Sequence, residues 1–223
     1  MWKALLIDVN ETLLDLAALD PLFEELFGDS TARRDWFGRV LLSAMTVTAT
    51  GGYQPFDTIA ASALSITGRC YGHEPGTDEL KRVGAAMRSL PPHPEVAGAL
   101  ARLRQQGHRL VALTNSRQAV LDEQLTNAGL RDGFDEALSV EAAGALKPSP
   151  AVYRYAADHL GATPDELLMI AAHGWDLAGA STVGLATAFI DRPGQYPDPL
   201  FPAPRYRERD LDALADAIVS ASD

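Results

Sequence analysis

Short apolar runs recur along the chain and alternate with longer segments in which apolar residues follow a helical period. The runs are residues 4–7, 110–113, 167–171 and 185–190, with a weaker one at 134–138. Runs of this kind are typical of strands buried on both faces, and strands that alternate with amphipathic helices form parallel sheets. The pattern therefore predicts an α/β fold with a mostly parallel sheet and covering helices.

The connection between the first two runs is too long for an ordinary loop. Residues 15 to about 90 have a helical pattern throughout, and the stiff segment LPPHPEV at 90–96 leads back to the sheet. We expect residues 15–90 to form a helical cap over one end of the sheet, and residues 1–14 and 91–223 to form the core. A helix-rich subdomain without a role at the site is the alternative.

Local signals mark the starts of further helices. Ser149 precedes Pro150, and the segment TPDE at 163–166 matches a capping box, so helical turns are expected to begin at 149 and 163. The proline-rich stretch 192–205 is expected to cross the surface before a C-terminal helix.

Composition and charge narrow the possible partners. A chain of 223 residues with 47% hydrophobic content can bury one full core and a smaller second unit. The single cysteine, Cys70, excludes an intrachain disulfide framework, and no apolar run approaches the length of a membrane helix, so we expect a cytoplasmic protein. The net charge of −11 disfavours nucleic acid and anionic membranes as partners, and a small anionic substrate would need local cations.

Polar residues follow several of the predicted strands. Asp8 follows the first, Thr114 and Asn115 the second, and His173 and Asp176 the strand at 167–171. The carboxyl ends of parallel strands share one edge of the sheet, where ligands bind in open α/β folds. Although an isolated Asp after a strand is more often a turn cap, the convergence of these groups predicts an active site.

Lys147 and Tyr153 lie in the segment LKPSPAVY, close to this edge. An ammonium group near Asp8 would lower the pKa of that carboxyl group, keep it an ionised nucleophile and attract an anionic substrate. An ordinary solvated lysine is the alternative for Lys147. Tyr153 is either a site residue or a core aromatic.

Four segments in order, DVNETLLD, LTNS, LKPSPAVY and AAHGWDLAGA, resemble the haloacid dehalogenase superfamily. The cap position, KPSPAVY and the Trp175–Asp176 pair are most similar to the L-2-haloacid dehalogenase branch. The resemblance implies a Rossmann-like core with a helical cap, Asp8 as the nucleophile, and a homodimer.

Asn10 departs from the superfamily's phosphatases, which resemble one another in carrying a second Asp there to protonate the leaving alkoxide. Ala172, four residues before Asp176, also leaves one carboxylate where a magnesium site usually has two. A halide leaves as a stable anion and needs neither the proton nor the metal. We therefore expect no metal and no cofactor.

The chain also departs from the better-known dehalogenases, which usually carry an aromatic residue at the place of Asn10, and Ser and Asn at the places of Ala171 and His173. A Glu11–His173 pair could replace the missing water-positioning groups, because the carboxylate would fix the imidazole tautomer while the other nitrogen deprotonates water. The pair resembles a variant subgroup thought to use such a dyad.

The expected function is (S)-2-haloacid dehalogenase, which converts short 2-haloalkanoates to 2-hydroxy acids and halide through an ester on Asp8. The (S) preference is carried over from the resemblance, and the motif does not distinguish chloride, bromide and fluoride. Lys147 and Asp176 would keep the charge balance, and Thr12, Thr114 and Asn115 are candidate hydrogen-bond donors to Asp8 or to the substrate carboxylate.

Arg39 lies 31 residues after Asp8, where the family carries a halide- or carboxylate-binding arginine, but Arg33 or Arg34 could serve instead. Trp36, with Phe37 and Phe56, could line a small dry pocket or simply fill the cap core. Two other functions compete: a magnesium-dependent small-molecule phosphatase on the same fold, and a non-catalytic binding module.

Overall fold

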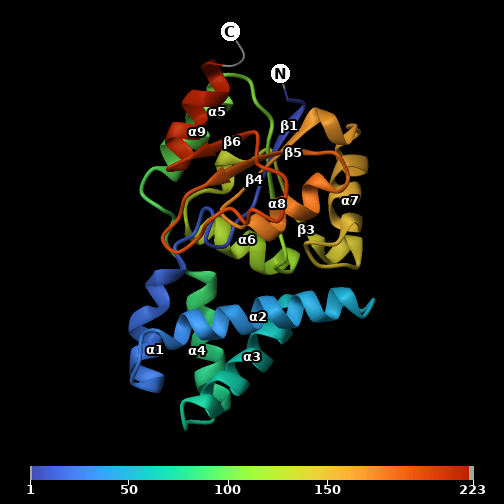
Figure 1. Ribbon diagram of the computed structural model, residues 1–223. Coiled ribbons are helices and arrows are strands. Elements are labelled where there is room, and N and C mark those ends of the chain that lie inside the picture. The colour runs from blue at the N-terminus through green and yellow to red at the C-terminus, as the bar shows by residue number, and fades with distance from the viewer. Residues whose placement is uncertain (1, 221–223) are drawn as a thin grey trace.

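The computed structural model describes residues 2–220 and contains one parallel six-stranded sheet. The strand order is β3-β2-β1-β4-β5-β6, and the order reverses between the neighbours β1 and β4 (Figure 1). The strands are β1 Ala4–Ile7, β2 Leu110–Thr114, β3 Glu136–Ser139, β4 Leu167–Ala171, β5 Ala186–Ile190 and β6 Tyr206–Glu208. This Rossmann-like arrangement confirms the predicted α/β class.

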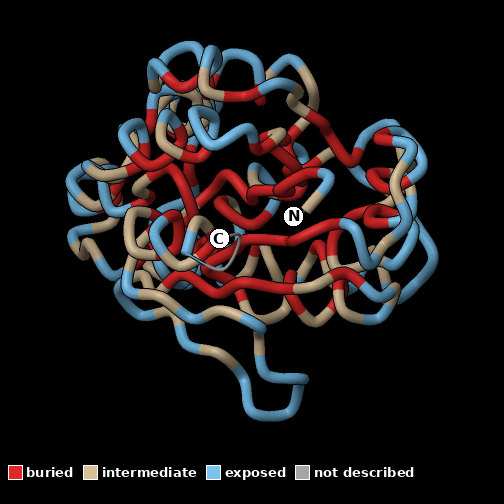
Figure 2. Tube along the Cα trace, turned by 90° about the horizontal axis from the view of Figure 1, so that it is seen from above, coloured by how far each residue is buried: buried red, intermediate tan, exposed pale blue. Residues whose placement is uncertain are grey.

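The central strands are buried on both faces because every residue of β1, β2 and β4 is apolar or small, apart from the terminal Thr114. Figure 2 shows these segments as a buried centre with exposed residues around it. Ile7, the last residue of β1, pairs with Ala112 of β2 and Ile170 of β4, so the ends of the three strands lie at one edge.

Helices cover both faces of this sheet. α5 and α9 pack together on one face, and α7 and α8 pack together on the other (Figure 1). A fifth helix, α6, connects β2 to β3. The five helices are α5 Val96–Gln105, α6 Gln118–Asn127, α7 Pro150–Leu160, α8 Gly174–Ser181 and α9 Leu211–Ser220.

The segment between β1 and α5 is helical, as predicted. After the 3-10 turn Leu16–Leu19 it forms α1 Asp20–Phe27, α2 Ala32–Ala49, α3 Phe56–Cys70 and α4 Thr77–Arg88. These four helices lie together beyond one end of the sheet (Figure 1). The ring centroids of Phe23 and Trp36 lie 5.1 Å apart, and both side chains form part of a buried apolar centre among these helices.

Two local details differ from the sequence prediction or refine it. The proline-rich stretch 192–205 is followed by β6, which the apolar pattern missed because this edge strand has only three residues and alternates Tyr, Arg and Glu. Ser149 caps α7 as expected, whereas the capping box at Thr163 begins only a single 3-10 turn, Pro164–Glu166, before β4.

None of the helices in the described part of the chain combines the length and apolar character that a membrane crossing requires.

Candidate active site

A small cavity opens where the strand order reverses. Asp8 directly follows β1, and His173 follows its neighbour β4, so both side chains reach the carboxyl edge of the sheet. The cavity is lined from the core by Asp8, Asn10, Thr114, Asn115, His173 and Trp175, and from the α1–α4 helices and the segments joining them by Phe37, Leu41 and Phe56.

Asp8 is held by three polar side chains. Its Oδ1 accepts a hydrogen bond from Lys147 Nζ at 3.0 Å, and its Oδ2 accepts one from Thr12 Oγ1 at 2.7 Å. His173 Nδ1 lies 3.3 Å from the same Oδ2. Burial opposes ionisation, but Lys147, His173 and Thr12 together hold the pKa of Asp8 well below its usual range. Asp8 is therefore an ionised carboxylate in a buried site.

Lys147 is 1% exposed and uses all three of its N–H donors. Besides Asp8, its ammonium donates to the carbonyl of Leu113 and to Asp176 Oδ2, both at 2.7 Å. Burial by itself would lower the pKa of Lys147, but Asp176 and Asp8 raise it above its ordinary value. The ammonium thus bridges two buried carboxylates, and the alternative of a solvated lysine is wrong.

Tyr153 supports Asp176 from behind and does not line the cavity, which corrects its prediction as a substrate-binding residue. Its hydroxyl donates to Asp176 Oδ1 at 2.6 Å, and the whole side chain is buried. α8 can approach this closely because Gly179 lacks a Cβ, which would lie 2.8 Å from Tyr153 Cε2 and 2.6 Å from the carbonyl of Pro148. Burial raises the pKa of Asp176, whereas Lys147 opposes that shift.

The predicted Glu11–His173 pair is in contact. His173 Nε2 lies 2.8 Å from Glu11 Oε2, which also accepts a hydrogen bond from Gln195 Nε2 at 3.2 Å. Both imidazole nitrogens therefore face carboxylates, an arrangement complementary to an imidazolium. Although burial acts in the opposite direction, Asp8 and Glu11 raise the pKa of His173 to about 9.

Glu11 has the only positive φ (+60°) among the described residues other than glycine. This left-handed conformation is unfavourable for a side chain that lacks a short amide or carboxylate of the Asn or Asp type, and such strain concentrates at functional sites. This backbone conformation in the turn DVNET directs the Glu11 carboxylate toward His173. The sequence predicted the pair but not the positive φ of Glu11.

Thr12, Thr114 and Asn115 are all buried at this edge, but their contacts differ. Thr12 Oγ1 accepts from the Ala172 N–H at 3.0 Å, which orients its own proton toward Asp8. Thr114 Oγ1 accepts from the N–H of Ser116 at 3.2 Å. Asn115 Oδ1 accepts from the backbone N–H of Lys147 at 2.9 Å, so its amide NH₂ is the group it can offer to the cavity.

Arg39 is not at the site, which corrects the spacing-based prediction. Its Nη2 lies 3.4 Å from Cys70 Sγ at the end of α3, and it does not line the cavity. Arg33 is the arginine of α2 that faces the core: it is 5% exposed, with Nη1 3.7 Å from Glu11 Oε1 and Nε 2.6 Å from Asp20 Oδ1. Because side chains four apart share a helix face, Arg33 lies on the same face as Phe37 and Leu41.

Of the three aromatic side chains predicted near the pocket, Phe37 and Phe56 line the cavity and Trp36 does not. Trp36 is buried among α1–α3, donates to the carbonyl of Ala60 at 3.0 Å and does not line the catalytic cavity, so its prediction as a substrate contact is also corrected. Phe37 does line it, with its ring centroid 6.4 Å from that of His173. Trp175, not singled out as a site residue, also lines the cavity, with its ring centroid 5.2 Å from that of His173. Its buried Nε1 has no acceptor within residues 2–220.

Asn10 and Asp176 do not form an open metal site. Asn10 Oδ1 accepts from Gln124 Nε2 at 3.0 Å, and its Nδ2 lies 3.4 Å from Ser116 Oγ. The two carboxylate oxygens of Asp176 are taken by Lys147 and Tyr153. Across the described part of the chain, no three His, Cys, Asp or Glu side chains are grouped so that they could hold a metal ion.

Six ionisable side chains of alternating charge thus run through the site in contact order: Asp176, Lys147, Asp8, His173, Glu11 and Arg33. This arrangement provides an ionised carboxylate at a small cavity, with His173 beside it and Asn10 where a second acid would protonate a leaving group. Chemically it suits displacement by the carboxylate, followed by attack of water.

Comparison with known proteins agrees with this geometry. Residues 2–184 match the family described as haloacid dehalogenase-like hydrolase. The chain is 33% identical to haloacetate dehalogenase H-2 of Moraxella sp. (strain B), over 75% of each protein, and 28% identical to (S)-2-haloacid dehalogenase 4A of Burkholderia cepacia, over 95% of this chain and 93% of that one. A structure of L-2-haloacid dehalogenase from Xanthobacter autotrophicus with chloropropionic acid covalently bound superposes with a TM-score of 0.92 at 25% identity, covering 98% of this chain and 99% of that one.

Proposed function

The chain belongs to the haloacid dehalogenase-like hydrolases, and from this premise we propose that it is an (S)-2-haloacid dehalogenase that hydrolyses short 2-haloalkanoates. The observation that carries the proposal is the pairing of an ionised Asp8 with Lys147 at a cavity where Asn10 replaces a second acid. The relatives named above, whose names and structures specify haloacetate and 2-haloacid dehalogenases, support the same substrate class.

In the first step, a carboxylate oxygen of Asp8 attacks C2 of the substrate from the side opposite the halogen. The oxygen–carbon bond forms as the carbon–halogen bond breaks, and the halide takes the bonding electron pair. Lys147 and Thr12 hold the carboxylate in place during this displacement. No proton donor is required, and the N–H groups of Asn115 and Trp175 on the cavity wall are available to the departing anion.

In the second step, water attacks the ester carbonyl carbon of Asp8 while His173 takes one of its protons. The bond between this carbon and the alkoxide oxygen breaks, the second proton of the water passes to the alkoxide, and the 2-hydroxy acid leaves. Glu11 accepts the hydrogen bond from Nε2, which makes Nδ1, the nitrogen nearer Asp8, the basic one. In the resting enzyme, the charges of Asp8 and Glu11 keep the pKa of His173 at about 9. Ester formation removes the charge of Asp8, so the pKa of His173 falls and its Nδ1 releases a proton to solvent. The neutral imidazole that results can act as a base.

The other site roles follow from these contacts. Asp176 balances the charge of Lys147, and Tyr153 positions Asp176. Arg33 positions Glu11 and takes the place at the site that was predicted for Arg39. Thr114 shapes the cavity wall and fixes the loop that carries Asn115. The mechanism uses no metal and no cofactor.

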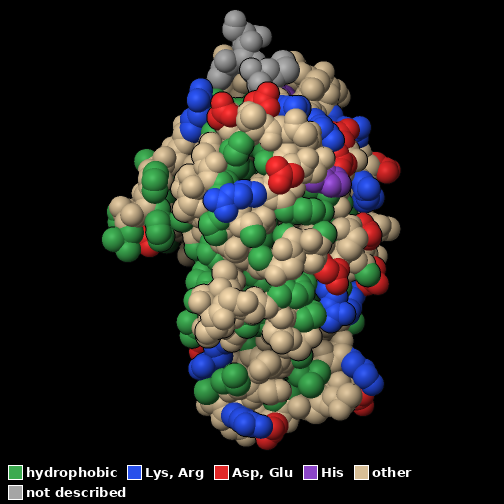
Figure 3. All heavy atoms as spheres, turned by 90° about the vertical axis from the view of Figure 1, so that its right-hand side faces the viewer, with side chains coloured by type: hydrophobic (Ala, Val, Ile, Leu, Met, Phe, Trp, Pro, Cys, Tyr) green, Lys and Arg blue, Asp and Glu red, His purple; other side chains and the backbone are tan. Residues whose placement is uncertain are grey.

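We also propose residues 15–90 as the cap, with residues 1–14 and 91–223 as the catalytic core, because Phe37, Leu41 and Phe56 close the cavity over Asp8. A cytoplasmic homodimer is the proposed assembly. Figure 3 shows hydrophobic side chains gathered on a projection of the surface, and exposed apolar side chains suited to a subunit contact are Leu42, Ile66, Tyr196, Leu200 and Phe201.

Halide release measured by ion chromatography tests the function directly. We expect the protein to release halide from chloroacetate and racemic 2-chloropropionate with EDTA present, and the Asp8→Asn form to release none. Phosphatase activity abolished by EDTA would instead support the magnesium-dependent alternative. The absence of both halide release and phosphatase activity would support a binding module.

A further inference from the structure

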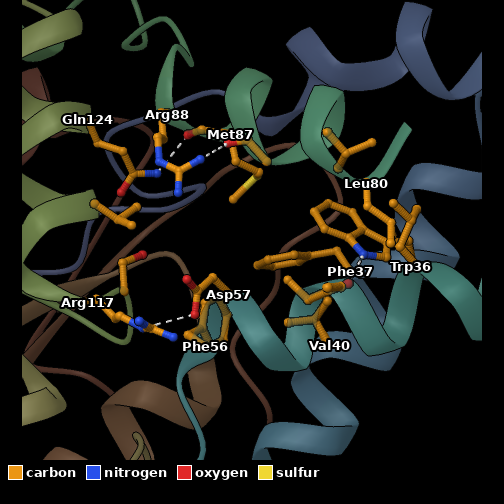
Figure 4. Close-up of a pocket in the computed structure, with 17 residues that line it drawn as sticks. Trp36, Phe37, Val40, Phe56, Asp57, Leu80, Met87, Arg88, Arg117 and Gln124 are labelled. Atoms are coloured by element: carbon orange, nitrogen blue, oxygen red, sulfur yellow. Dashed lines mark hydrogen bonds and ion pairs between the residues drawn. The ribbon is translucent and has the colours of Figure 1, made fainter. Parts of the chain in front are cut away.

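A second cavity lies directly behind the catalytic one, between the cap and α6. It has a volume of about 80 Å³ and a mainly apolar wall (Figure 4). Its apolar lining comes from α2, α3, α4 and α6: Trp36, Phe37, Val40, Phe56, Ala60, Ala61, Leu64, Leu80, Val83, Met87 and Val120.

Two phenylalanines separate the cavities. Phe37 and Phe56 line both the catalytic cavity and the second one. Ser116 and Gln124, on the wall of the second cavity, contact Asn10 on the wall of the first. The apolar cavity therefore begins about one side chain away from the reacting carboxylate.

The charged groups at the rim of this cavity are already paired. Arg117 Nε lies 3.1 Å from Asp57 Oδ1, and Arg88 Nε lies 3.0 Å from Glu123 Oε2. The first pair joins α3 to the residue that precedes α6, and the second joins α4 to α6. Figure 4 shows Asp57, Arg88 and Arg117 at the cavity. The cavity thus offers apolar surface without an uncommitted charge, so its occupant should be uncharged and aliphatic.

We propose that this second cavity binds the alkyl chain of the substrate, so that the enzyme prefers 2-haloalkanoates of four to six carbons over haloacetate. The inference rests on the proposed function. The carboxylate and C2 lie in the catalytic cavity, and the chain passes between Phe37 and Phe56 into the apolar space. Each methylene buried there leaves water, which corresponds to a roughly three- to fourfold gain in affinity.

The test compares KM and kcat for halide release from bromoacetate, 2-bromopropionate, 2-bromobutanoate and 2-bromohexanoate. We expect KM to fall roughly three- to fourfold for each added methylene beyond propionate. Val83 is buried in α4 on the cavity wall, and Val83→Phe would fill the space. This variant should lower the ratio of kcat/KM for bromohexanoate to that for bromoacetate by at least about tenfold.

Ala85→Phe, which introduces the same side chain at an exposed position of the same helix, is the matched control and should keep the wild-type ratio. Val83→Leu should reduce the ratio by a smaller factor and replaces Val83→Phe if that variant does not fold. A wild-type KM that rises with chain length, or equal ratios for the Val83 and Ala85 variants, would overturn the proposal.

Calorimetric titration with hexanoate and acetate separates failure of this inference from failure of the proposed function. If no bromoacid releases halide, the dehalogenase proposal fails, and the cavity is then judged by binding alone. Tighter binding of hexanoate than of acetate, weakened by Val83→Phe, supports the alkyl site. Equal binding of the two acids rejects it.

Discussion

The imidazole of His173 has Asp8 on one side and Glu11 on the other: Nδ1 lies 3.3 Å from Asp8 Oδ2, and Nε2 lies 2.8 Å from Glu11 Oε2. One carboxylate is the proposed nucleophile, and its charge disappears when the ester forms. The other keeps its charge through both steps. The same histidine is therefore an imidazolium that stabilises ionised Asp8 before the displacement, and a base after it.

The first prediction concerns the two half-reactions. His173→Ala should slow ester hydrolysis by about 10²–10⁴-fold while leaving ester formation, because only the second step needs a base. Rapid-quench halide measurements should then show a burst of one halide per active site, followed by slow turnover. Glu11→Gln should give the same burst with a smaller decrease in turnover. Loss of the burst itself in His173→Ala would contradict this division of roles.

The second prediction concerns stability and pH. The pKa of His173 is raised from its ordinary 6.5 to about 9, so its protonation stabilises the folded state fully below about pH 6.5, and this contribution is lost as the pH rises through 9. The shift corresponds to about 3 kcal/mol. The free energy of unfolding, measured with urea, should fall between pH 6 and pH 9.5 in the wild-type protein. Most of this fall should be absent from His173→Gln. An equal pH dependence in both proteins would show that His173 is not the titrating group.

The third prediction distinguishes the two cap arginines. Arg33→Met should lower kcat about tenfold with little change in KM, because Glu11 loses a group that orients it. Arg33→Lys should restore part of the loss. Arg39→Met changes the same residue type on the same helix, but its side chain contacts Cys70, so both kinetic constants should stay near wild type. A large increase in KM for Arg39→Met would restore the role that its spacing suggested.

The fourth prediction concerns the buried ammonium. Lys147→Met should destabilise the fold by about 3–5 kcal/mol, because Asp8 and Asp176 would remain buried without their shared cation. Adding Asp176→Asn should recover part of this free energy. Lys3→Met is the control: Lys3 is exposed, donates to the carbonyl of Gly161 and lies 3.9 Å from Glu166 Oε2, so its loss should cost less than about 1 kcal/mol. Equal unfolding free energies for the two lysine variants would refute the buried-bridge account.

The sheet and the helical segment were predictable because their signals are long or strongly patterned. The predicted runs at 167–171 and 110–113 match β4 and β2 to within one residue, and the apolar pattern of 15–90 indicated the α1–α4 helices. β6 was missed because an edge strand of three residues with mixed polarity carries neither a period nor an apolar run.

The core part of the site was also predictable, because residues that follow neighbouring parallel strands must meet. Asp8, which follows β1, and His173 and Asp176, which follow its neighbour β4, came together for that reason. Lys147 reaches Asp8 and Asp176 from the segment between β3 and α7, which the resemblance to the family indicated. The cap contacts were not predictable in this way, since a one-residue difference on a helix rotates a side chain by about 100°. Spacing from Asp8 therefore selected Arg39, whereas helix packing placed Arg33 beside Glu11 and Phe37 at the cavity.

The most direct test of the whole account is the mass of the Asp8 peptide from His173→Ala protein that has been incubated with bromoacetate and digested. The account predicts a mass increase equal to one carboxymethyl group on the peptide that contains Asp8, and no increase in the Asp8→Asn/His173→Ala protein. Halide release with an unmodified Asp8 peptide, or a carboxymethyl group on a different residue, would contradict nucleophilic attack by Asp8.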